Sequence, residues 1–309
     1  YTDELNGKIL PDEKQLISLN KKKFISYNQL HITPTADKIA FVTNDLGRFK
    51  VRMMILEKRH SKVVMRGGFK QNILPLDHSY PILAWDPSGK RLAIVYTRRN
   101  KTFLVTYDTD EKKKAKRLIA SFQKILSISL GNDINTLYIS AVNRGQSDIY
   151  TFNIKSSKME QVTNDCWDDL NPVFVNLPAR QGILFASNRL NDTLRTQNMD
   201  TILPNGNFDI WFYNTKTKSK ELVRITNTPN ISEQLPMSFN QQWFSYLSDE
   251  NGINNRYVGY IDSVFWHYDH YYYFADSTTI NPKYNMDSLM LAQHRNYDST
   301  TQIPVYRDT

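Results

Sequence analysis

The strongest constraint on the fold is a unit of short β-strands that recurs about every 45 residues. Pro172 lies 91 positions after Pro81, which corresponds to two such steps. Pro236 lies 64 positions after Pro172, and removing the 18-residue insertion Leu190 to Asn207 leaves 46. Each unit holds four short apolar or alternating runs separated by polar turns, which is typical of a β-propeller blade. Because one blade cannot bury both faces of its sheet, neighbouring units must stack.

The runs and turns inside the units support this interpretation. Asp86 to Gly89 reads as a tight turn, because Pro87 fixes φ and Gly89 tolerates a positive φ. Ile39 to Thr43 and Leu92 to Tyr96 are nearly continuous apolar runs, as expected for strands covered on both faces. The seam between two units is predicted in Ser147 to Phe174, which holds the last strands of one unit and the first strand of the next.

The predicted fold is therefore all-β: a propeller of four-stranded antiparallel blades with five clear repeats. We expect one domain over residues 1–309, with the repeats in 27–262. The terminal segments 1–26 and 263–309 would together complete a sixth blade. Within them, Pro11 to Ile17 reads as either a short helix or a turn and strand, and Met286 to Gln293 as a short helix.

Composition agrees with a folded chain and narrows the possible functions. A hydrophobic content of 40% and a single cysteine, Cys166, are compatible with a large core without an intrachain disulfide. No apolar run reaches the roughly 18 residues of a spanning helix, although peripheral membrane association stays open. The chain opens on Tyr1 without an apolar leader, so we expect a processed chain or a piece of a longer protein.

Positive charge is concentrated in the first part of the chain. Residues 1–125 carry 25 Lys and Arg against 12 Asp and Glu, whereas residues 126–309 carry 14 against 19. Such a basic region could meet nucleic acid, an anionic lipid surface or an acidic protein. It could equally be a solvated surface, because Lys21 to Lys23 and Lys112 to Lys114 fall at predicted turns. We favour the solvated surface and expect no nucleic-acid partner.

Several motifs resemble the TolB-like β-propeller repeat. They are Asn171 to Phe174, Ile183 to Arg189, Asp209 to Trp211 and Ile225 to Asn227, with Trp85 to Lys90 as the strand-turn core and Asp148 to Tyr150 with Val162 to Asn164 as the later half. The resemblance covers five repeats. It implies a protein of the bacterial cell envelope, periplasmic or associated with the outer membrane, that binds other envelope proteins within a larger complex.

The function expected from this resemblance is a non-catalytic protein-interaction scaffold, as a subunit of an envelope transport or secretion assembly. No Gly-x-Ser-x-Gly elbow and no phosphate-binding loop occurs, so the sequence predicts no catalytic residue and no cofactor. Two alternatives remain. One is a propeller accessory domain of a peptidase or lyase, and the other is a polyanion-binding module formed by residues 1–125.

Two groups of residues are candidates for partner binding. Trp167, Asp168 and Asp169 lie in a loop expected at the mouth of the channel, where an exposed Trp beside acids suits a partner and paired carboxylates suit a cation. The alternative is a packed Trp with turn-capping acids. Cys166 beside them reads as an inert small residue.

The second group is the aromatic tail, which would act as a partner surface or as a plug over the channel. Its candidate residues are Phe265, Trp266, Tyr268 and Tyr271. His267 and His270 lie three apart in the same stretch, and in a strand such positions face opposite sides. No metal site is therefore predicted there.

Overall fold

A computed structural model describes residues 25–71, 77–119, 122–177, 180–194, 206–239, 242–261, 263–281 and 297–308. All regular structure in these residues is β-strand, and the strands form six antiparallel sheets. Five sheets are successive blades in which neighbouring strands follow the chain order. The predicted all-β architecture is therefore confirmed. Within the described ranges, no helix long and apolar enough to cross a membrane occurs.

The blades contain the following strands. Blade 1 contains β1 (Ile25–Ile32), β2 (Lys38–Asp45), β3 (Arg48–Ile55) and β4 (His60–Gly67). Blade 2 contains β5 (Ile82–Trp85), β6 (Arg91–Arg98), β7 (Lys101–Asp108) and β8 (Lys114–Leu118). Blade 3 contains β9 (Lys124–Leu130), β10 (Thr136–Asn143), β11 (Gln146–Asn153) and β12 (Met159–Gln161). Blade 4 contains β13 (Asp169–Asn176), β14 (Gln181–Ser187), β15 (Asp209–Asn214) and β16 (Val223–Arg224), and blade 5 contains β17 (Glu233–Ser238), β18 (Trp243–Ser248) and β19 (Asn255–Tyr260).

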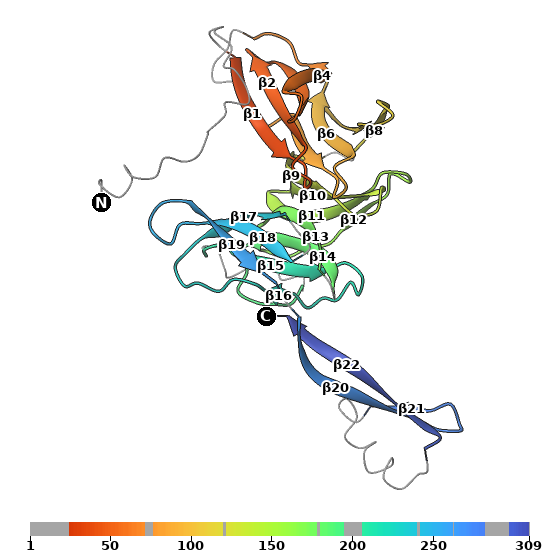
Figure 1. The fold of residues 1–309 in the computed structure, drawn as a ribbon. Coiled ribbons are helices and arrows are strands. Elements are labelled where there is room, and N and C mark those ends of the chain that lie inside the picture. Colours follow the sequence, from red (N-terminus) through yellow and green to blue (C-terminus); the bar gives the residue numbers. More distant parts are fainter. Residues whose placement is uncertain are drawn as a thin grey trace.

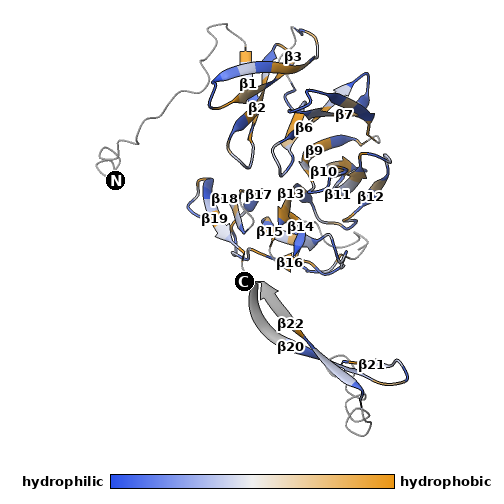
Figure 2. Cartoon of the chain, turned by 45° about the vertical axis from the view of Figure 1, so that its right-hand side comes forward, coloured by the Kyte–Doolittle hydropathy of each residue, from blue (hydrophilic) through white to orange (hydrophobic). Residues whose placement is uncertain are grey.

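The five blades follow one another around a common centre (Figure 1). The first strand of each blade packs on the first strand of the next, from β1 through β5, β9 and β13 to β17. Among the described residues, no closely packed pair of strands joins blade 1 to blade 5. Figure 2 shows the same order from a second direction, with the ring open between these two blades.

Both faces of an inner blade are buried, as the apolar runs predict. In β6, Leu92 and Ile94 belong to a cluster shared with blade 1, while Ala93 and Val95 belong to one shared with blade 3. All four side chains are fully buried. The alternation of a strand thus sends successive residues into two different interfaces. This is why these runs lack the polar positions of a half-exposed strand.

The turn at Asp86 to Gly89 forms as predicted. Gly89 has a φ of 67°, a region that favours glycine. Asp86 Oδ1 accepts hydrogen bonds from the backbone N–H groups of Lys90 and Arg91, each at 2.9 Å. The turn therefore satisfies its own backbone and fixes the register of β5 against β6.

The end of the chain forms a separate arm. Its strands are β20 (Ser263–Tyr273), β21 (Thr279–Ile280) and β22 (Ser299–Asp308), which pair only with one another. The arm projects away from the blades in both views. The described tail thus forms a sheet of its own outside the five blades, and a sixth blade stays a prediction. Pro11 to Ile17 and Met286 to Gln293 lie outside the described residues.

Candidate functional site

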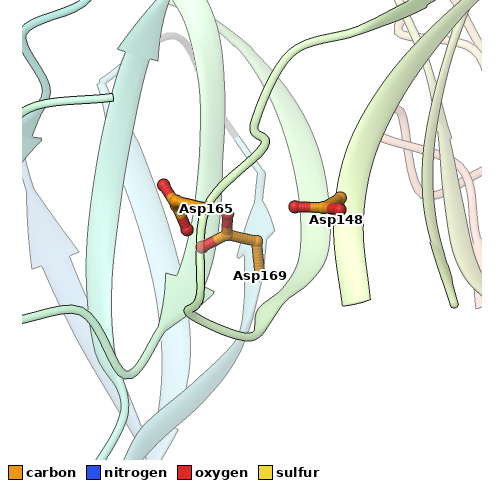
Figure 3. Close-up of side chains that lie close together, drawn as sticks. All are labelled: Asp148, Asp165 and Asp169. Atoms are coloured by element: carbon orange, nitrogen blue, oxygen red, sulfur yellow. The ribbon is translucent and has the colours of Figure 1, made fainter. Parts of the chain in front are cut away.

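The predicted mouth loop contributes to a buried cluster of charged side chains at the seam of blades 3 and 4. We call Asp148, Asp165, Asp169 and Arg189 the acidic seam. Asp148 lies in β11, Asp165 in the loop after β12, Asp169 at the start of β13, and Arg189 two residues after β14. The carboxylates lie close together (Figure 3), with one oxygen of each within 4.8 Å of the others.

Arg189 is the cation of the acidic seam. Its Nη2 donates to both carboxylate oxygens of Asp169, at 2.9 and 2.8 Å, and lies 3.3 Å from Asp165 Oδ2. Its Nε donates to Ser187 Oγ at 3.1 Å, and its side chain is completely buried. The guanidinium thus joins the loop after β12, which leads into blade 4, to the end of β14, which is a strand of blade 4.

The acidic seam holds three carboxyl groups but only one guanidinium. Burial, followed by the charges of Asp169 and Asp165, raises the pKa of Asp148 to about 7, although hydrogen bonds from Gln161 and Thr163 oppose the shift. Burial and the charge of Asp169 also raise the pKa of Asp165, while Arg189 lowers it. The site can therefore retain a proton near neutral pH. Its oxygens are also the ligand type that hard cations prefer, although Arg189 already holds both oxygens of Asp169.

The remaining residues of the mouth loop have structural partners. Trp167 is only 3% exposed, so the expectation of an exposed Trp was wrong and the packed alternative was right. Its carbonyl oxygen accepts a hydrogen bond from Gln146 Nε2 at 2.7 Å. Asp168 Oδ1 accepts a hydrogen bond from the Ser147 hydroxyl, and the backbone N–H of Asp168 donates to Asn188 Oδ1 at 2.8 Å. Cys166 is buried as well, and burial raises its pKa, which fits an unreactive thiol.

Sequence reasoning missed Asp148, Asp165 and Arg189 as members of one site. A signal for Asp148 was present, because Asp148-Ile149 and Asp209-Ile210 are equivalent in successive units. In each, the isoleucine N–H donates to a threonine hydroxyl, at 2.9 Å for Thr163 and 2.8 Å for Thr226. A comparison of units would have placed Asp148 beside the mouth loop. It would not have shown that Arg189 lies there too.

The second group of predicted residues lies in the arm. Phe265 and Trp266 are in β20, and their side chains lie outside the described part of the structure. Tyr268 is 50% exposed, and Tyr271 is partly buried. The plug alternative was wrong for the described arm, because the arm projects away from the ring. Of the insertion Leu190 to Asn207, residues 195–205 lie outside the described ranges.

A groove of about 1100 Å³ runs over blades 1 and 2 and the entry to blade 3. We call it the basic groove. Its aromatic lining is Phe49, Phe69, Tyr80, Tyr96 and Phe122, and its charged lining is Arg66, Arg98, Arg99 and Asp77. Among the described residues, none of these three arginines forms an ion pair. In a smaller groove of about 560 Å³ between blades 3 and 4, Lys158 and Lys218 instead pair with Glu160, at 2.9 and 3.7 Å.

No family model and no curated protein sequence matches this chain. Its fold is similar to solved structures. TolB from Acinetobacter baumannii aligns with a TM-score of 0.54 and 14% identity over 76% of this chain and 52% of that one. A putative TolB from Agrobacterium tumefaciens aligns with a TM-score of 0.51 and 13% identity over 83% and 80%. An acylaminoacyl peptidase in complex with Z-Gly-Gly-Phe-chloromethyl ketone aligns with a TM-score of 0.51 and 14% identity over 85% and 46%.

These likenesses concern the fold. The chain matches about half the length of the Acinetobacter TolB and less than half of the peptidase. The order of four-stranded blades in the structure agrees with the repeat motifs of the sequence. The chain therefore has the TolB-like β-propeller fold.

Proposed function

We propose that this chain is a non-catalytic protein-interaction scaffold of the bacterial cell envelope, and that its basic groove receives an acidic segment of a partner. In this proposal the protein acts in the periplasm or at the outer membrane, as part of a larger transport or secretion assembly. The observation that carries the proposal is the combination, in one groove, of aromatic side chains and arginines that form no ion pair with another described residue. Arginine and aromatic residues are the types that contribute most at protein interfaces.

The arginines are held on a rigid support. Arg99 and Asn100 form the two-residue turn between β6 and β7, and both have a positive φ, at 52° and 56°. This is the geometry of a type I′ hairpin, whose twist matches that of the flanking strands. The turn therefore presents Arg98 and Arg99 from a fixed backbone, which lowers the ordering cost of binding.

Some aromatic side chains of the basic groove are held in place by contacts within the protein, and one is exposed to solvent. Tyr80 Oη accepts the backbone N–H of Ile125 at 2.8 Å, and the rings of Phe49 and Tyr96 meet edge to face at 6.4 Å. Phe69 is 72% exposed and is thus free to contact a partner. An acidic segment with an apolar side chain would match this pairing of charge and ring surface.

The first test measures binding of an acidic probe. We expect the double variant Arg98→Glu/Arg99→Glu to weaken binding of a fluorescein-labelled, Glu-rich peptide containing one Phe by at least about tenfold, because each reversal replaces attraction by repulsion. Fluorescence anisotropy at 50 and 300 mM salt measures it. Lys112→Glu/Lys113→Glu is the matched control, since it makes the same charge change on the β7–β8 turn of the same blade.

Equal loss in both variants, with a steep dependence on salt, would favour the polyanion alternative through residues 1–125. Unchanged binding in both would exclude this groove. A second test places a photocrosslinking phenylalanine analogue at Phe69, and as control at Ile134, which is 56% exposed on blade 3. Adducts with another envelope protein at Phe69 alone would support the scaffold.

A second candidate is an accessory propeller of a peptidase, which the likeness to the acylaminoacyl peptidase favours. In that case the ring would control access to a catalytic domain encoded in the same reading frame. A Gly-x-Ser-x-Gly elbow in the sequence following Thr309 would favour this candidate over the scaffold.

A further inference from the structure

The turns that lead into the fourth strands of blades 1 to 4 are rich in lysine. These four turns, which we call the outer turns, are residues 56–59, 109–113, 154–158 and 215–222. Together they carry nine Lys and Arg against four Asp and Glu. The nine basic residues are all exposed, and they are Lys58, Arg59, Lys112, Lys113, Lys155, Lys158, Lys216, Lys218 and Lys220.

The outer turns share one backbone arrangement. In blades 2, 3 and 4 the third strand ends on Asp108, Asn153 or Asn214. The side chain of each of these residues accepts a hydrogen bond from the N–H three positions later, at 2.9, 2.8 and 3.1 Å. Such side chains stabilise a turn by satisfying its backbone. The outer turns are therefore ordered and equivalent from blade to blade.

The outer turns place basic residues where glycine would be the easier choice. In all four turns the residue four positions after the third strand has a positive φ. These residues are Arg59, Lys112, Ser157 and Lys218, with φ values of 48°, 58°, 57° and 49°. This left-handed region favours glycine. Because three of the four positions hold Lys or Arg instead, the side chain is what these positions require.

The outer turns all lie at one end of the ring, which we call the turn end. In an antiparallel blade, the turn after the first strand and the turn after the third strand are at the same end. Neighbouring blades are aligned there, because Lys38 Nζ of blade 1 donates to the Gly89 carbonyl of blade 2 at 3.2 Å. Likewise, Glu160 of blade 3 lies 3.7 Å from Lys218 of blade 4. The acidic seam and the basic groove lie at the opposite end, where the first strands begin.

Most of this positive charge is not neutralised. Lys158 and Lys218 both pair with Glu160, and Lys113 lies 3.0 Å from Glu111. Two of the four acidic residues of the outer turns form no ion pair with another described residue. The same is true of six basic residues, Lys58, Arg59, Lys112, Lys155, Lys216 and Lys220. An excess of unpaired positive charge is thus spread over the turn end.

Two apolar side chains are exposed at the same end. Ile134, in the turn between β9 and β10, is 56% exposed, and Phe239, directly after β17, is 48% exposed. Both follow a first strand, so they lie nearer the centre of the ring than the outer turns (Figure 1). A basic surface with a few apolar side chains is the composition of a protein surface that lies on a membrane.

The spread of the outer turns indicates an extended partner. A short acidic segment would meet one or two of the turns, whereas a lipid surface presents negative charge in a plane and can meet all four at once. Eight of the nine basic residues are lysines. A lysine is a point charge on a flexible stem, which suits mobile headgroups, whereas arginine suits the fixed geometry of one bound carboxylate or phosphate.

We propose that the turn end of the ring rests on an anionic lipid surface. The lysines of the outer turns lie among the headgroup phosphates, and Ile134 and Phe239 reach the interface between headgroups and acyl chains. The basic groove then faces away from the membrane and stays open to a protein partner. This inference does not depend on the function proposed for that groove.

The first experiment measures partition onto vesicles. Phosphatidylcholine vesicles with about 30% phosphatidylglycerol are the probe, and phosphatidylcholine vesicles are the neutral reference. We expect Lys155→Gln/Lys216→Gln/Lys220→Gln to lower the partition coefficient at least about tenfold in co-sedimentation, because each basic residue near an anionic surface strengthens binding about fivefold. The matched control removes the same charge from exposed residues at the opposite end and should leave partition unchanged. It is Arg98→Gln/Arg99→Gln/Arg144→Gln.

Three results would overturn the proposal. One is a parent chain that binds anionic vesicles no better than neutral ones. Another is an equal loss in the two triple variants, which would mean that net charge and not the turn end is responsible. The third is a turn-end variant that keeps vesicle binding but loses binding of a Glu-rich peptide, which would assign the surface to an acidic protein. Circular dichroism establishes that the variants fold.

The second experiment tests the apolar contact. Ile134→Ser is expected to lower the partition coefficient at least about threefold, because it removes apolar surface that the bilayer buries. Leu118→Ser is the control, since Leu118 is 53% exposed at the end of β8 that lies away from the turn end. An effect of Ile134→Ser no larger than that of Leu118→Ser would contradict the proposed orientation on the membrane.

Discussion

Replacing Arg189 with methionine is expected to lower the free energy of unfolding by about 3–5 kcal/mol, the cost of removing one partner from a buried ion pair. Methionine keeps an unbranched side chain but lacks the guanidinium, which lies 5.7 and 5.9 Å from the centroids of the Phe185 and Trp211 rings. It leaves Asp165 and Asp169 buried without their cation. Urea unfolding at pH 7.5, followed by tryptophan fluorescence, measures the loss.

Two further variants show whether the loss comes from uncompensated charge. Lys158→Met removes an exposed partner of Glu160 at 2.9 Å and should leave the free energy of unfolding almost unchanged, because solvent screens this pair. The double variant Asp169→Asn/Arg189→Met should recover part of the loss, because one of the stranded charges is gone. If Arg189→Met costs no more than Lys158→Met, Arg189 does not stabilise the acidic seam.

The blades could be predicted from sequence because their determinants are local. A strand covered on both faces shows an apolar run, as Leu92 to Val95 does, and the run between two such strands shows turn residues such as Asp86 and Gly89. The insertion in blade 4 lengthens the interval from Pro172 to Pro236, and subtracting its 18 residues restores an interval of 46. These features depend on neighbours in sequence and on the period of a strand.

The acidic seam could not be predicted in the same way. Asp148 and Arg189 are 41 positions apart, and the stacking of blade 3 on blade 4 brings them together. The burial of Trp167 is likewise a tertiary property, since a polar loop sequence does not show which of its residues point inward. For the same reason the sequence showed the aromatic richness of the arm but not its direction.

The pH dependence of stability tests the carboxyl groups of the acidic seam, above all that of Asp148. The pKa of Asp148 is about 7 in the folded chain and 3.8 without the fold, so the folded state keeps its proton to a higher pH. Between about pH 4 and pH 7 the folded state therefore binds more protons than the unfolded state, and stability falls as pH rises. Above pH 7 both states are ionised at this residue and the penalty stays constant.

Asp148→Asn is therefore expected to raise the free energy of unfolding at pH 8 by about 2–4 kcal/mol and to flatten the fall between pH 4.5 and pH 7. The amide keeps an oxygen that can accept the hydrogen bond which Gln161 Nε2 donates to Asp148 at 3.0 Å. Asp165 and Glu233, whose pKa values are also raised by burial, contribute to the slope that remains. Urea unfolding at pH 4.5, 6 and 8 measures both effects.

Asp110→Asn, on the exposed turn of blade 2, is the control for loss of one negative charge and should leave the slope unchanged. Greater stability of Asp148→Asn at pH 8 but not at pH 4.5 would locate the penalty in the ionised carboxylate.

A variant that is less stable than the parent chain at pH 8 would mean that the charge of Asp148 is stabilising. A cation bound among Asp148, Asp165 and Asp169 would produce that result, because it favours the ionised form. Adding a chelator to the parent chain then separates the two cases: a loss of stability points to a bound cation, and no change points to hydrogen bonding from Gln161 and Thr163.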